Sequence, residues 1–313
     1  MKYTILEQLI INYPDKNWDW VELSSNPNIT IKFIKNNLHL PWRWNNVSSN
    51  PNLTLKFIKN NLDKEWNWIA ISKNSNITIK DISNNLELPW HWEWVSFNSN
   101  ITMEFINNNL DKNWDWGRVS YNSNITIKDI NNNLKLPWKW KWVSINPNIT
   151  IEFIKNNLDK YWNWSILSKH KNITMDDINN NLNLNWDYND IIINPNLTIE
   201  FINNNLDKNW NWFRINVYAK LTLKFINNNI NKFKWYYISR NPNLTNEIIN
   251  EIIIRQCDWI SLSYNPSITI DIINNNLDKP WDWQYVSRNP NLTLEFINNN
   301  LDKDWNYRLP VYK

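Results

Sequence analysis

Three carboxylates stand at equivalent places in a repeated pattern and are the first candidates for acid–base chemistry. Asp81, Asp129 and Asp177 follow one another at intervals of 48 residues. A paired acid–base site needs carboxyl groups about 5–10 Å apart. Helices pack about 8–10 Å apart, which would separate carboxylates two repeats apart by roughly 16–20 Å. Each Asp also lies three residues after a Thr, where a carboxylate accepts a backbone N–H in a capping box. The pattern therefore favours helix capping over catalysis.

The other reactive side chains lack the spacing of a catalytic or metal site. His39, His91 and His170 fall at different places in the repeat, and no two have the spacing that puts metal ligands on one helix face. Cys257 is the only cysteine, which excludes an internal disulfide and a multi-thiolate metal site. Gly117 is the only glycine, whereas phosphate-binding loops need several. We predict no catalytic residue, no metal and no cofactor.

The positions of these side chains are set by a tandem repeat of 24 residues. Thr recurs every 24 residues from Thr30 to Thr222, then after one 23-residue step at Thr245, and every 24 residues again to Thr293. Most of these Thr residues follow an Asn-Pro-Asn or Asn-Ser-Asn turn. Each is therefore a natural N-cap whose hydroxyl accepts a backbone N–H. The chain enters this pattern through an incomplete first repeat at Trp18.

Apolar spacing within a repeat predicts two short helices. Behind the Thr, Ile31, Ile34 and Leu38 fall on one helix face. We expect the second helix to open at an N-cap such as Asp63, or with a proline such as Pro41 in its first turn, where the missing N–H costs little. This second helix is short enough to be either α or 3-10. No sustained period-2 alternation indicates a strand.

A pair of short helices cannot bury its apolar face alone, but stacked neighbours bury a continuous core. The sequence therefore predicts an all-α fold, an α-solenoid of twelve to thirteen 24-residue units. The repeats run from end to end without a linker, so we predict a single repeat domain over 1–313. Within it, 1–25 is an N-terminal cap or partial unit, 26–289 the tandem units, and 290–313 a C-terminal unit or cap.

A longer 48-residue period overlies the first eight repeats. The repeats headed by Thr78, Thr126 and Thr174 carry Asp where their neighbours carry Phe three residues after the Thr. The same repeats carry Leu in place of Lys at the following connection. Successive repeats are therefore not equivalent, and we expect the core to be built from pairs of repeats.

Trp-x-Trp pairs and Asn runs recur in almost every repeat. The 24 Trp residues could stack bases or sugars. Their fixed repeat positions instead favour a core role, with neighbouring Asn side chains as partners for the indole N–H groups. Asn runs such as 107–109 could form a polar recognition strip. A ladder with one Asn per repeat, satisfying carbonyl groups that short helices leave open, is favoured.

The repeat resembles the leucine-rich repeat variant family, on a stretch that recurs along nearly the whole chain and is exemplified by Asn50-Pro51-Asn52-Leu53-Thr54 through Trp66-Asn67-Trp68. The resemblance implies a right-handed superhelix of α and short α or 3-10 elements without a sheet. The doubled Trp, the Asn run and Thr in place of the usual helix-starting Pro depart from that family. Its cluster-binding cysteines have no counterpart here, so no metal carries over. The bias toward Asn, Ile and Lys in tandem units also resembles repeat proteins of giant DNA viruses of the mimivirus type. Neither resemblance supplies catalytic residues.

Two positions of the second helix vary in character from repeat to repeat, two and five residues after the second Trp. Positions that accept Glu, Trp, Arg or Ala in otherwise regular repeats are not required by the core, and exposed aromatics beside Arg suit protein recognition. The alternative is that these side chains pack against a neighbouring helix edge. The candidate partner-binding residues are Trp94, Phe97, Arg118, Tyr121, Trp142, Ile145, Arg214, Tyr237, Tyr264 and Tyr285.

We therefore predict a non-enzymatic scaffold whose partner is a protein or peptide. The alternatives are a nucleic-acid-binding solenoid and a structural or self-assembling viral component. A formal net charge of only +3 gives little support to electrostatic binding of nucleic acid. No apolar run approaches the roughly 18 residues of a membrane span, and the first residues lack a signal-peptide pattern. We expect a soluble intracellular protein, in the host cytoplasm or the virion if the source is viral.

Overall fold

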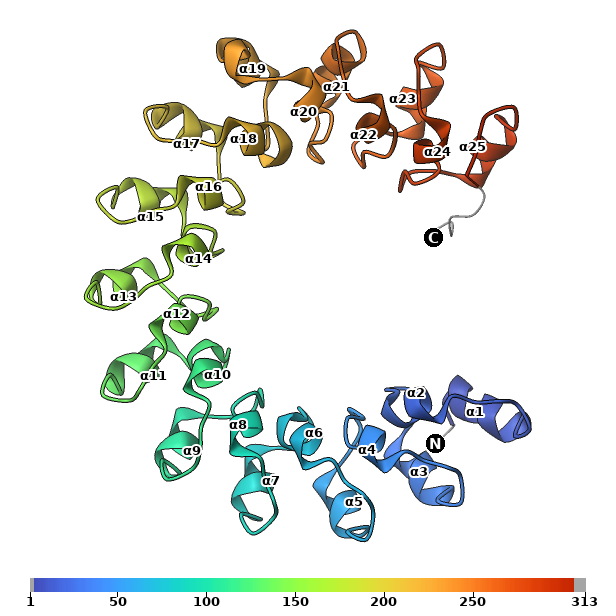
Figure 1. Cartoon of the computed structure of the whole chain (residues 1–313), viewed down its shortest axis with the longest axis vertical. Coiled ribbons are helices and arrows are strands. Elements are labelled where there is room, and N and C mark those ends of the chain that lie inside the picture. The colour runs from blue at the N-terminus through green and yellow to red at the C-terminus, as the bar shows by residue number, and fades with distance from the viewer. Residues whose placement is uncertain (1–2, 307–313) are drawn as a thin grey trace. The chain divides into compact units, whose positions relative to one another are not determined.

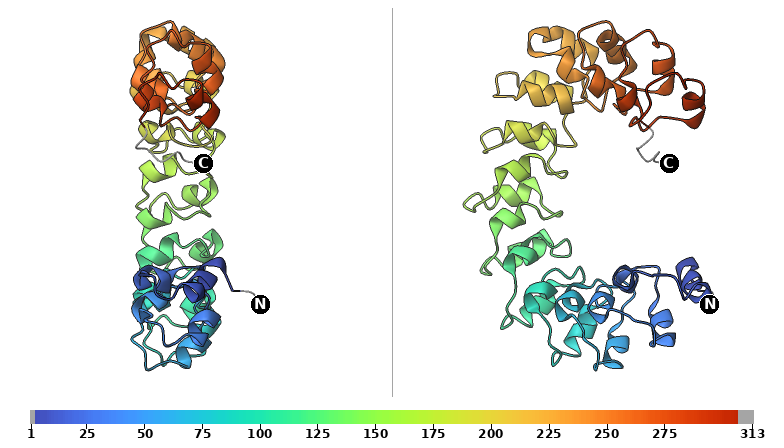
Figure 2. Two further views of the ribbon diagram at one scale, coloured as in Figure 1. Left: turned by 90° about the vertical axis from the view of Figure 1, so that its right-hand side faces the viewer. Right: turned by 45° about the vertical axis from the view of Figure 1, so that its right-hand side comes forward.

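The computed structural model describes residues 3–306. Within that range it contains 25 α-helices, one short 3-10 helix and no strand. Both views of Figure 2 show short helices joined by loops. The helices are only four to eight residues long, too short to be stable alone, so their stability comes from packing against neighbouring repeats. The predicted all-α, α-solenoid fold is confirmed.

The chain divides into two compact units, residues 1–163 and 164–313. The boundary falls inside a Trp-Asn-Trp motif at 162–164 and not in a linker. The same type of helix pair builds both units. A single domain over 1–313 stays a prediction.

In the N-terminal unit the helices form two rows, with the first helix of each repeat in one row and the second helix in the other (Figure 1). The first helices are α1 (Ile5–Asn12), α3 (Ile31–Asn36), α5 (Leu55–Lys59), α7 (Ile79–Ser83), α9 (Met103–Asn107), α11 (Ile127–Asn132) and α13 (Ile151–Lys155). The second helices are α2 (Trp20–Ser25), α4 (Trp44–Val47), α6 (Trp68–Lys73), α8 (Trp92–Val95), α10 (Trp116–Tyr121) and α12 (Trp140–Val143).

The C-terminal unit contains the same two kinds of helix. Its first helices are α15 (Met175–Asn179), α17 (Ile199–Asn204), α19 (Leu223–Asn228), α21 (Asn246–Ile253), α23 (Ile270–Asn274) and α25 (Leu294–Asn298). Its second helices are α14 (Trp164–Ser168), α16 (Tyr188–Ile191), α18 (Trp212–Tyr218), α20 (Trp235–Ile238), α22 (Trp259–Ser263) and α24 (Trp283–Val286). The second helices are thus α-helical, and the 3-10 helix η1 (Ile230–Lys232) lies in a connection instead.

Thr residues cap the first helices, as predicted. Thr30 accepts the Phe33 N–H on its Oγ1 at 3.1 Å, and every first helix from α1 to α25 has an equivalent Thr. Asp81, Asp129 and Asp177 form capping boxes with their Thr residues. The carboxylates predicted to be caps are therefore caps.

The first repeat is more complete than predicted. Residues 1–25 were expected to hold a partial repeat, but α1 and α2 form a full helix pair. Thr4 caps α1, and Glu7 completes the capping box. The buried Glu7 carboxylate also accepts the backbone N–H and the hydroxyl of Thr30, both at 2.7 Å. The 26-residue step from Thr4 to Thr30 hid this repeat from a search at a period of 24. Of the predicted C-terminal unit, residues 307–313 lie outside the described range.

The second helix begins later than predicted. Asp63 does not cap it but lies in the preceding turn, where it pairs with Lys64 at 2.7 Å, and Pro41 also precedes the helix. The helix opens at the second Trp of the Trp-x-Trp motif, and the residue between the two Trp residues is its N-cap. Asp115, for example, accepts the Arg118 N–H at 3.1 Å. The Trp-x-Trp motif therefore marks the start of the second helix, which the apolar spacing alone did not indicate.

The core consists of one apolar side chain from each part of the repeat. In the repeat after Thr102 these are Ile101 before the Thr, Ile106 in the first helix, Val119 in the second helix and Trp114 between the helices, all buried. Leu38 was predicted to share the buried face, but it is 46 % exposed because α3 ends at Asn36. The equivalent residue is also exposed in every later repeat but one: Leu62, Leu86, Leu110, Leu134, Leu158, Leu182, Leu206, Ile230, Leu277 and Leu301. The exception is Ile253, which is buried in the longer helix α21.

The Trp residues belong to the core and to the contacts between repeats, as predicted. The indole of Trp42 donates to the backbone carbonyl of Asn37 at 2.8 Å, so the partner is a main-chain oxygen and not the predicted Asn side chain. Wherever the next repeat has an aromatic ring at its first Trp position, the second Trp of the motif meets that ring edge to face. Trp44 and Trp66 are an example, with ring centroids 5.4 Å apart. The Trp-x-Trp pairs thus connect neighbouring repeats.

An asparagine ladder runs between repeats, but it uses a different Asn from the predicted one. The first Asn of the Asn-Pro-Asn turn is buried and donates to carbonyl groups of the preceding repeat. Asn98 donates from Nδ2 to Ser72, Asn74 and Ile77 at 3.5, 3.2 and 3.0 Å. The last Asn of the Asn run works within its own repeat instead, as Asn109 does by donating to the Phe105 carbonyl at 2.9 Å.

A buried serine in most repeats adds a second connection. Ser96 donates to the Trp92 carbonyl at 3.1 Å and accepts the Asp115 N–H of the next repeat at 3.0 Å. Asn216 stands at this place in its repeat and accepts the Lys234 N–H in the same way at 2.9 Å. The recurring serines are therefore structural.

The 48-residue period appears in the second helices as an alternation of length. In the N-terminal unit α2, α6 and α10 have six residues, whereas α4, α8 and α12 have four. Each six-residue helix packs most closely against the four-residue helix that follows it. The expected pairing of repeats is therefore present within this unit.

Candidate interaction surface

The candidate residues lie on or directly after second helices, and the structure separates them into two groups. The aromatic stripe of the N-terminal unit consists of Trp94, Phe97, Arg118, Tyr121, Trp142 and Ile145, which come from α8, α10 and α12 and the turns after α8 and α12. The tyrosine group of the C-terminal unit consists of Arg214, Tyr237, Tyr264 and Tyr285, which come from α18, α20, the turn after α22, and α24.

Four rings of the aromatic stripe form an unbroken series across three repeats. Trp94 stacks on Phe97 with ring centroids 5.4 Å apart and an interplanar angle of 18°. Phe97 meets Tyr121 edge to face at 6.4 Å, and Tyr121 lies 5.6 Å from Trp142. The spacing of 24 residues therefore brings these variable positions together as predicted.

Arg118 contacts the first two rings of this series. Its guanidinium carbon is 4.3 Å from the ring centroid of Trp94 and 3.9 Å from that of Phe97, which is cation–π geometry. Asp115 pairs with the Arg118 Nε at 3.1 Å, and the Glu93 carbonyl accepts from Nη1 at 3.0 Å. Lys73 adds a second cation over Trp94 at 5.0 Å. The rings are thus held in place by neighbouring charges.

The outer part of the stripe is not core. Phe97, Trp142 and Ile145 are 38 %, 44 % and 37 % exposed, while Val95 and Val143 beneath them are fully buried. Gly117 of α10 lies beside Trp142, since a Cβ at Gly117 would be 3.4 Å from the Trp142 Nε1, an ordinary van der Waals distance. The only glycine of the chain thus lies under the stripe. The alternative that all these side chains fill a helix edge does not hold for the three exposed ones.

The tyrosine group is less continuous. Tyr264 and Tyr285 approach each other at 5.8 Å, and Arg288 lies 4.9 Å over Tyr285. Arg214 instead lies 3.7 Å from the Asp190 carboxylate. Tyr237 contacts two rings that sequence analysis missed, Phe213 at 4.9 Å and Tyr236 at 5.5 Å. Both residues precede a candidate position by one residue. They were missed because only the positions two and five residues after the second Trp were considered.

Ion pairs and burial determine the pKa values near the tyrosine group. Hydrogen bonding to the Asp258 carboxylate raises the pKa of Arg240, whose Nη2 lies 3.0 Å from Asp258 Oδ2. Burial raises the pKa of the Cys257 thiol to about 11. The thiol is therefore protonated at neutral pH, and a protonated thiol is a poor nucleophile.

Neither a metal cluster nor a membrane-spanning helix occurs among residues 3–306. No three His, Cys, Asp or Glu side chains of that range are grouped so that they would hold a metal ion. None of its helices combines the length and the apolar character that crossing a bilayer requires.

The fold and the surface define a tandem-repeat helical protein of the α-solenoid class. No family model matches the chain, and no curated protein or solved structure is significantly similar to it. The resemblances to leucine-rich repeat variants and to giant-virus repeat proteins therefore stay predictions.

Proposed function

We propose that this protein is a non-enzymatic scaffold that binds a protein or peptide partner through the aromatic stripe of its N-terminal unit. The observation that carries the proposal is the series of rings from Trp94 to Trp142, with Arg118 against the first two rings. Trp, Tyr and Arg are the residues in which binding energy concentrates at protein interfaces. The repeat provides the rigid support, because the backbone beneath the rings is tied to its neighbours by the Asn and Ser ladders.

The arrangement favours a partner over a purely structural role for these rings. Aromatic pairs each contribute about 0.5–1.5 kcal/mol beyond buried area, but Phe97 and Trp142 leave much of their surface in solvent. Held rings with exposed faces are available for a partner at little further cost in side-chain entropy. Arg118 is already compensated by Asp115, so the stripe offers apolar and cation–π contacts and little net charge.

The test is capture of partners with the double variant Phe97→Ser/Trp142→Ser. These are the two most exposed rings of the stripe, so each change is expected to lower the free energy of unfolding by no more than about 1–2 kcal/mol. Tagged wild-type protein, expressed in its native cell and analysed by mass spectrometry after nuclease treatment, should recover a stoichiometric protein. The double variant should bind that protein at least about thirtyfold more weakly, as expected for a hot spot.

The matched control is Tyr161→Ser, which removes an aromatic ring that is 90 % exposed and lies off the stripe. It should bind like the wild type. Unfolding of the double variant would instead assign the rings to the core. A recovery that vanishes after nuclease treatment would favour a nucleic-acid partner, and concentration-dependent oligomers in light scattering would favour self-assembly.

A further inference from the structure

In several repeats the second Trp contacts two rings of the next repeat, and in others, such as that of Trp68, it contacts one. Trp92 stacks on Phe105 with centroids 6.1 Å apart, and Trp114 meets it edge to face at 5.4 Å. Lys112 lies 5.6 Å over the same indole. Two rings and one cation therefore contact this indole.

Trp235 has lost both ring partners. The two ring positions of the following repeat are occupied by Ile248 and Cys257, and Trp235 makes no ring contact within residues 3–306. Only the cation is kept, as Arg255 at 4.8 Å. The repeat that contains Trp235 is also the 23-residue one, with η1 in its connection. The irregularity therefore leaves this half-buried indole without the ring contacts that the following repeat supplies elsewhere.

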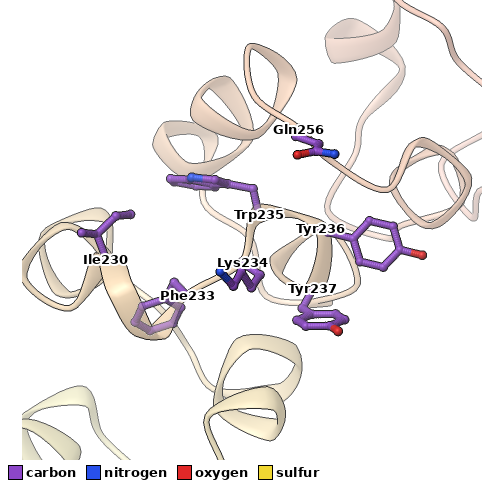
Figure 3. Close-up of a pocket in the computed structure, with 7 residues that line it drawn as sticks. All are labelled: Ile230, Phe233, Lys234, Trp235, Tyr236, Tyr237 and Gln256. Atoms are coloured by element: carbon purple, nitrogen blue, oxygen red, sulfur yellow. The ribbon is translucent and has the colours of Figure 1, made fainter.

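A pocket of about 500 Å³ lies beside this indole (Figure 3). Phe233, Tyr236 and Tyr237 supply further rings to its lining, and Gln256 adds an amide. The volume falls within the roughly 300–1,000 Å³ of ligand sites. An aromatic side chain is the kind of group that such a lining accommodates.

Lys234 gives the pocket its charge. Its side chain extends between Phe233 and Trp235 (Figure 3) and makes no ion pair with any described residue. The neighbouring arginines are compensated, since Arg255 pairs with Glu251 at 2.6 Å and Arg240 with Asp258 at 3.0 Å. The uncompensated cation in the pocket is thus Lys234, which complements a carboxylate.

We propose that this pocket binds an aromatic side chain of a partner peptide that carries a carboxylate beside the ring. The ring lies against Trp235, and the carboxylate pairs with the Lys234 ammonium beside it (Figure 3). The inference rests on the proposed function in that the ligand belongs to a protein partner. It concerns the C-terminal unit alone, so it can be tested separately from the aromatic stripe.

The test titrates three blocked peptides into the whole protein and follows binding by saturation-transfer NMR. The peptides are acetyl-Asp-Trp-Asp-amide, its neutral isostere acetyl-Asn-Trp-Asn-amide, and acetyl-Asp-Ala-Asp-amide, which lacks the ring. The acidic Trp peptide should bind most tightly and the Ala peptide should not bind. Lys234→Gln should raise the Kd of the acidic Trp peptide about threefold to fivefold, the upper range for an exposed ion pair, and leave that of the neutral peptide unchanged.

Lys224→Gln is the matched control, because Lys224 is exposed in the same unit and does not line the pocket. It should leave all three Kd values unchanged. Equal weakening of the acidic and neutral peptides by Lys234→Gln, or no binding of the acidic Trp peptide at several millimolar, would overturn the inference. The Phe97→Ser/Trp142→Ser variant should bind the peptides like the wild type. Failure of the peptides to bind would therefore not contradict the proposal for the aromatic stripe. Failure of the stripe variant to lose its partner would likewise not contradict the proposal for the pocket.

Discussion

The first Asn of the turn is the residue on which adjoining repeats depend most. Asn98 is fully buried, and its amide donates to three carbonyl groups of the preceding repeat. Its Oδ1 accepts the Asn100 N–H at 2.9 Å, which shapes the turn itself. One short side chain thereby satisfies both sides of a junction, which explains why Asn stands at equivalent turns along the chain.

Asn98→Ala is expected to lower the free energy of unfolding by about 2–3 kcal/mol, because it leaves buried carbonyl groups and a turn N–H without their partner. Urea unfolding followed by circular dichroism measures the change. The matched control is Asn108→Ala, at an exposed position in the same repeat, where a change within about 0.5 kcal/mol is expected. Equal effects of the two substitutions would show that the ladder contributes nothing particular.

The sequence predicts a ladder with one Asn per repeat, but places it in the Asn run. The Asn that forms the ladder is instead the first Asn of the turn. The Asn run follows a short helix, so its amides were natural partners for open helix ends, and Asn109 does bond its own helix. The ladder depends on how two repeats stack, which no local pattern reveals. The aromatic stripe was predictable for the opposite reason: variable side chains in a fixed repeat need only the period to be placed together.

At the scale of the helix, capping decides which segments become helical. The Thr caps were predictable because a Thr after a turn and before an apolar run is a local signature. The second helix was placed too early because Asp63 has the same kind of local signature. Its carboxylate accepts from the neighbouring Lys64 instead, which lowers the pKa of Asp63. The true cap lies between two Trp residues, and only the packing of both indoles fixes it there.

Several second helices have an N-cap residue whose side chain makes no capping bond, and His91 at the start of α8 is one of them. His91→Asp should raise the free energy of unfolding by roughly 1 kcal/mol, with a rise in Tm of about 2–4 °C. The new carboxylate would accept a backbone N–H of the first turn, as Asp115 does in α10. Thermal unfolding by calorimetry measures it. His91→Ala, which offers no acceptor, should give no increase; an equal gain there would exclude capping as the cause.

At the scale of the molecule, the structural period is 48 residues and not 24. The sequence showed this in the alternation of Asp and Phe in the first helices, and the N-terminal unit shows it in second helices of six and four residues. The ladder alternates as well. Asn98 and Asn146 each reach three carbonyl groups, whereas Asn74 and Asn122 each reach two. Two kinds of junction therefore follow each other in turn.

Because of this alternation, we expect the order of stability of two deletion proteins to be the opposite of the order that the number of removed repeats predicts. In a solenoid of equivalent repeats, stability falls with each repeat removed. Deleting residues 50–97 removes two repeats of the N-terminal unit and joins Ser49 to Asn98, so that Asn98 takes the place of Asn50 and the alternation is kept. Deleting residues 74–97 removes one repeat but brings α6 and α10, both of six residues, next to each other.

We therefore expect the smaller deletion to be the more harmful one. The mismatched junction should cost about 2 kcal/mol or more relative to the 48-residue deletion, a difference in Tm of about 4–8 °C. Calorimetry on both proteins, with light scattering to confirm their state of association, measures this difference. A protein lacking residues 74–97 that melts at or above the temperature of the one lacking 50–97 would show that the repeats are interchangeable. If the protein lacking residues 74–97 melts at the lower temperature, the pair of repeats is the element from which the solenoid is built. The aromatic stripe, which crosses α8, α10 and α12, is then a surface that depends on keeping the pairs in register.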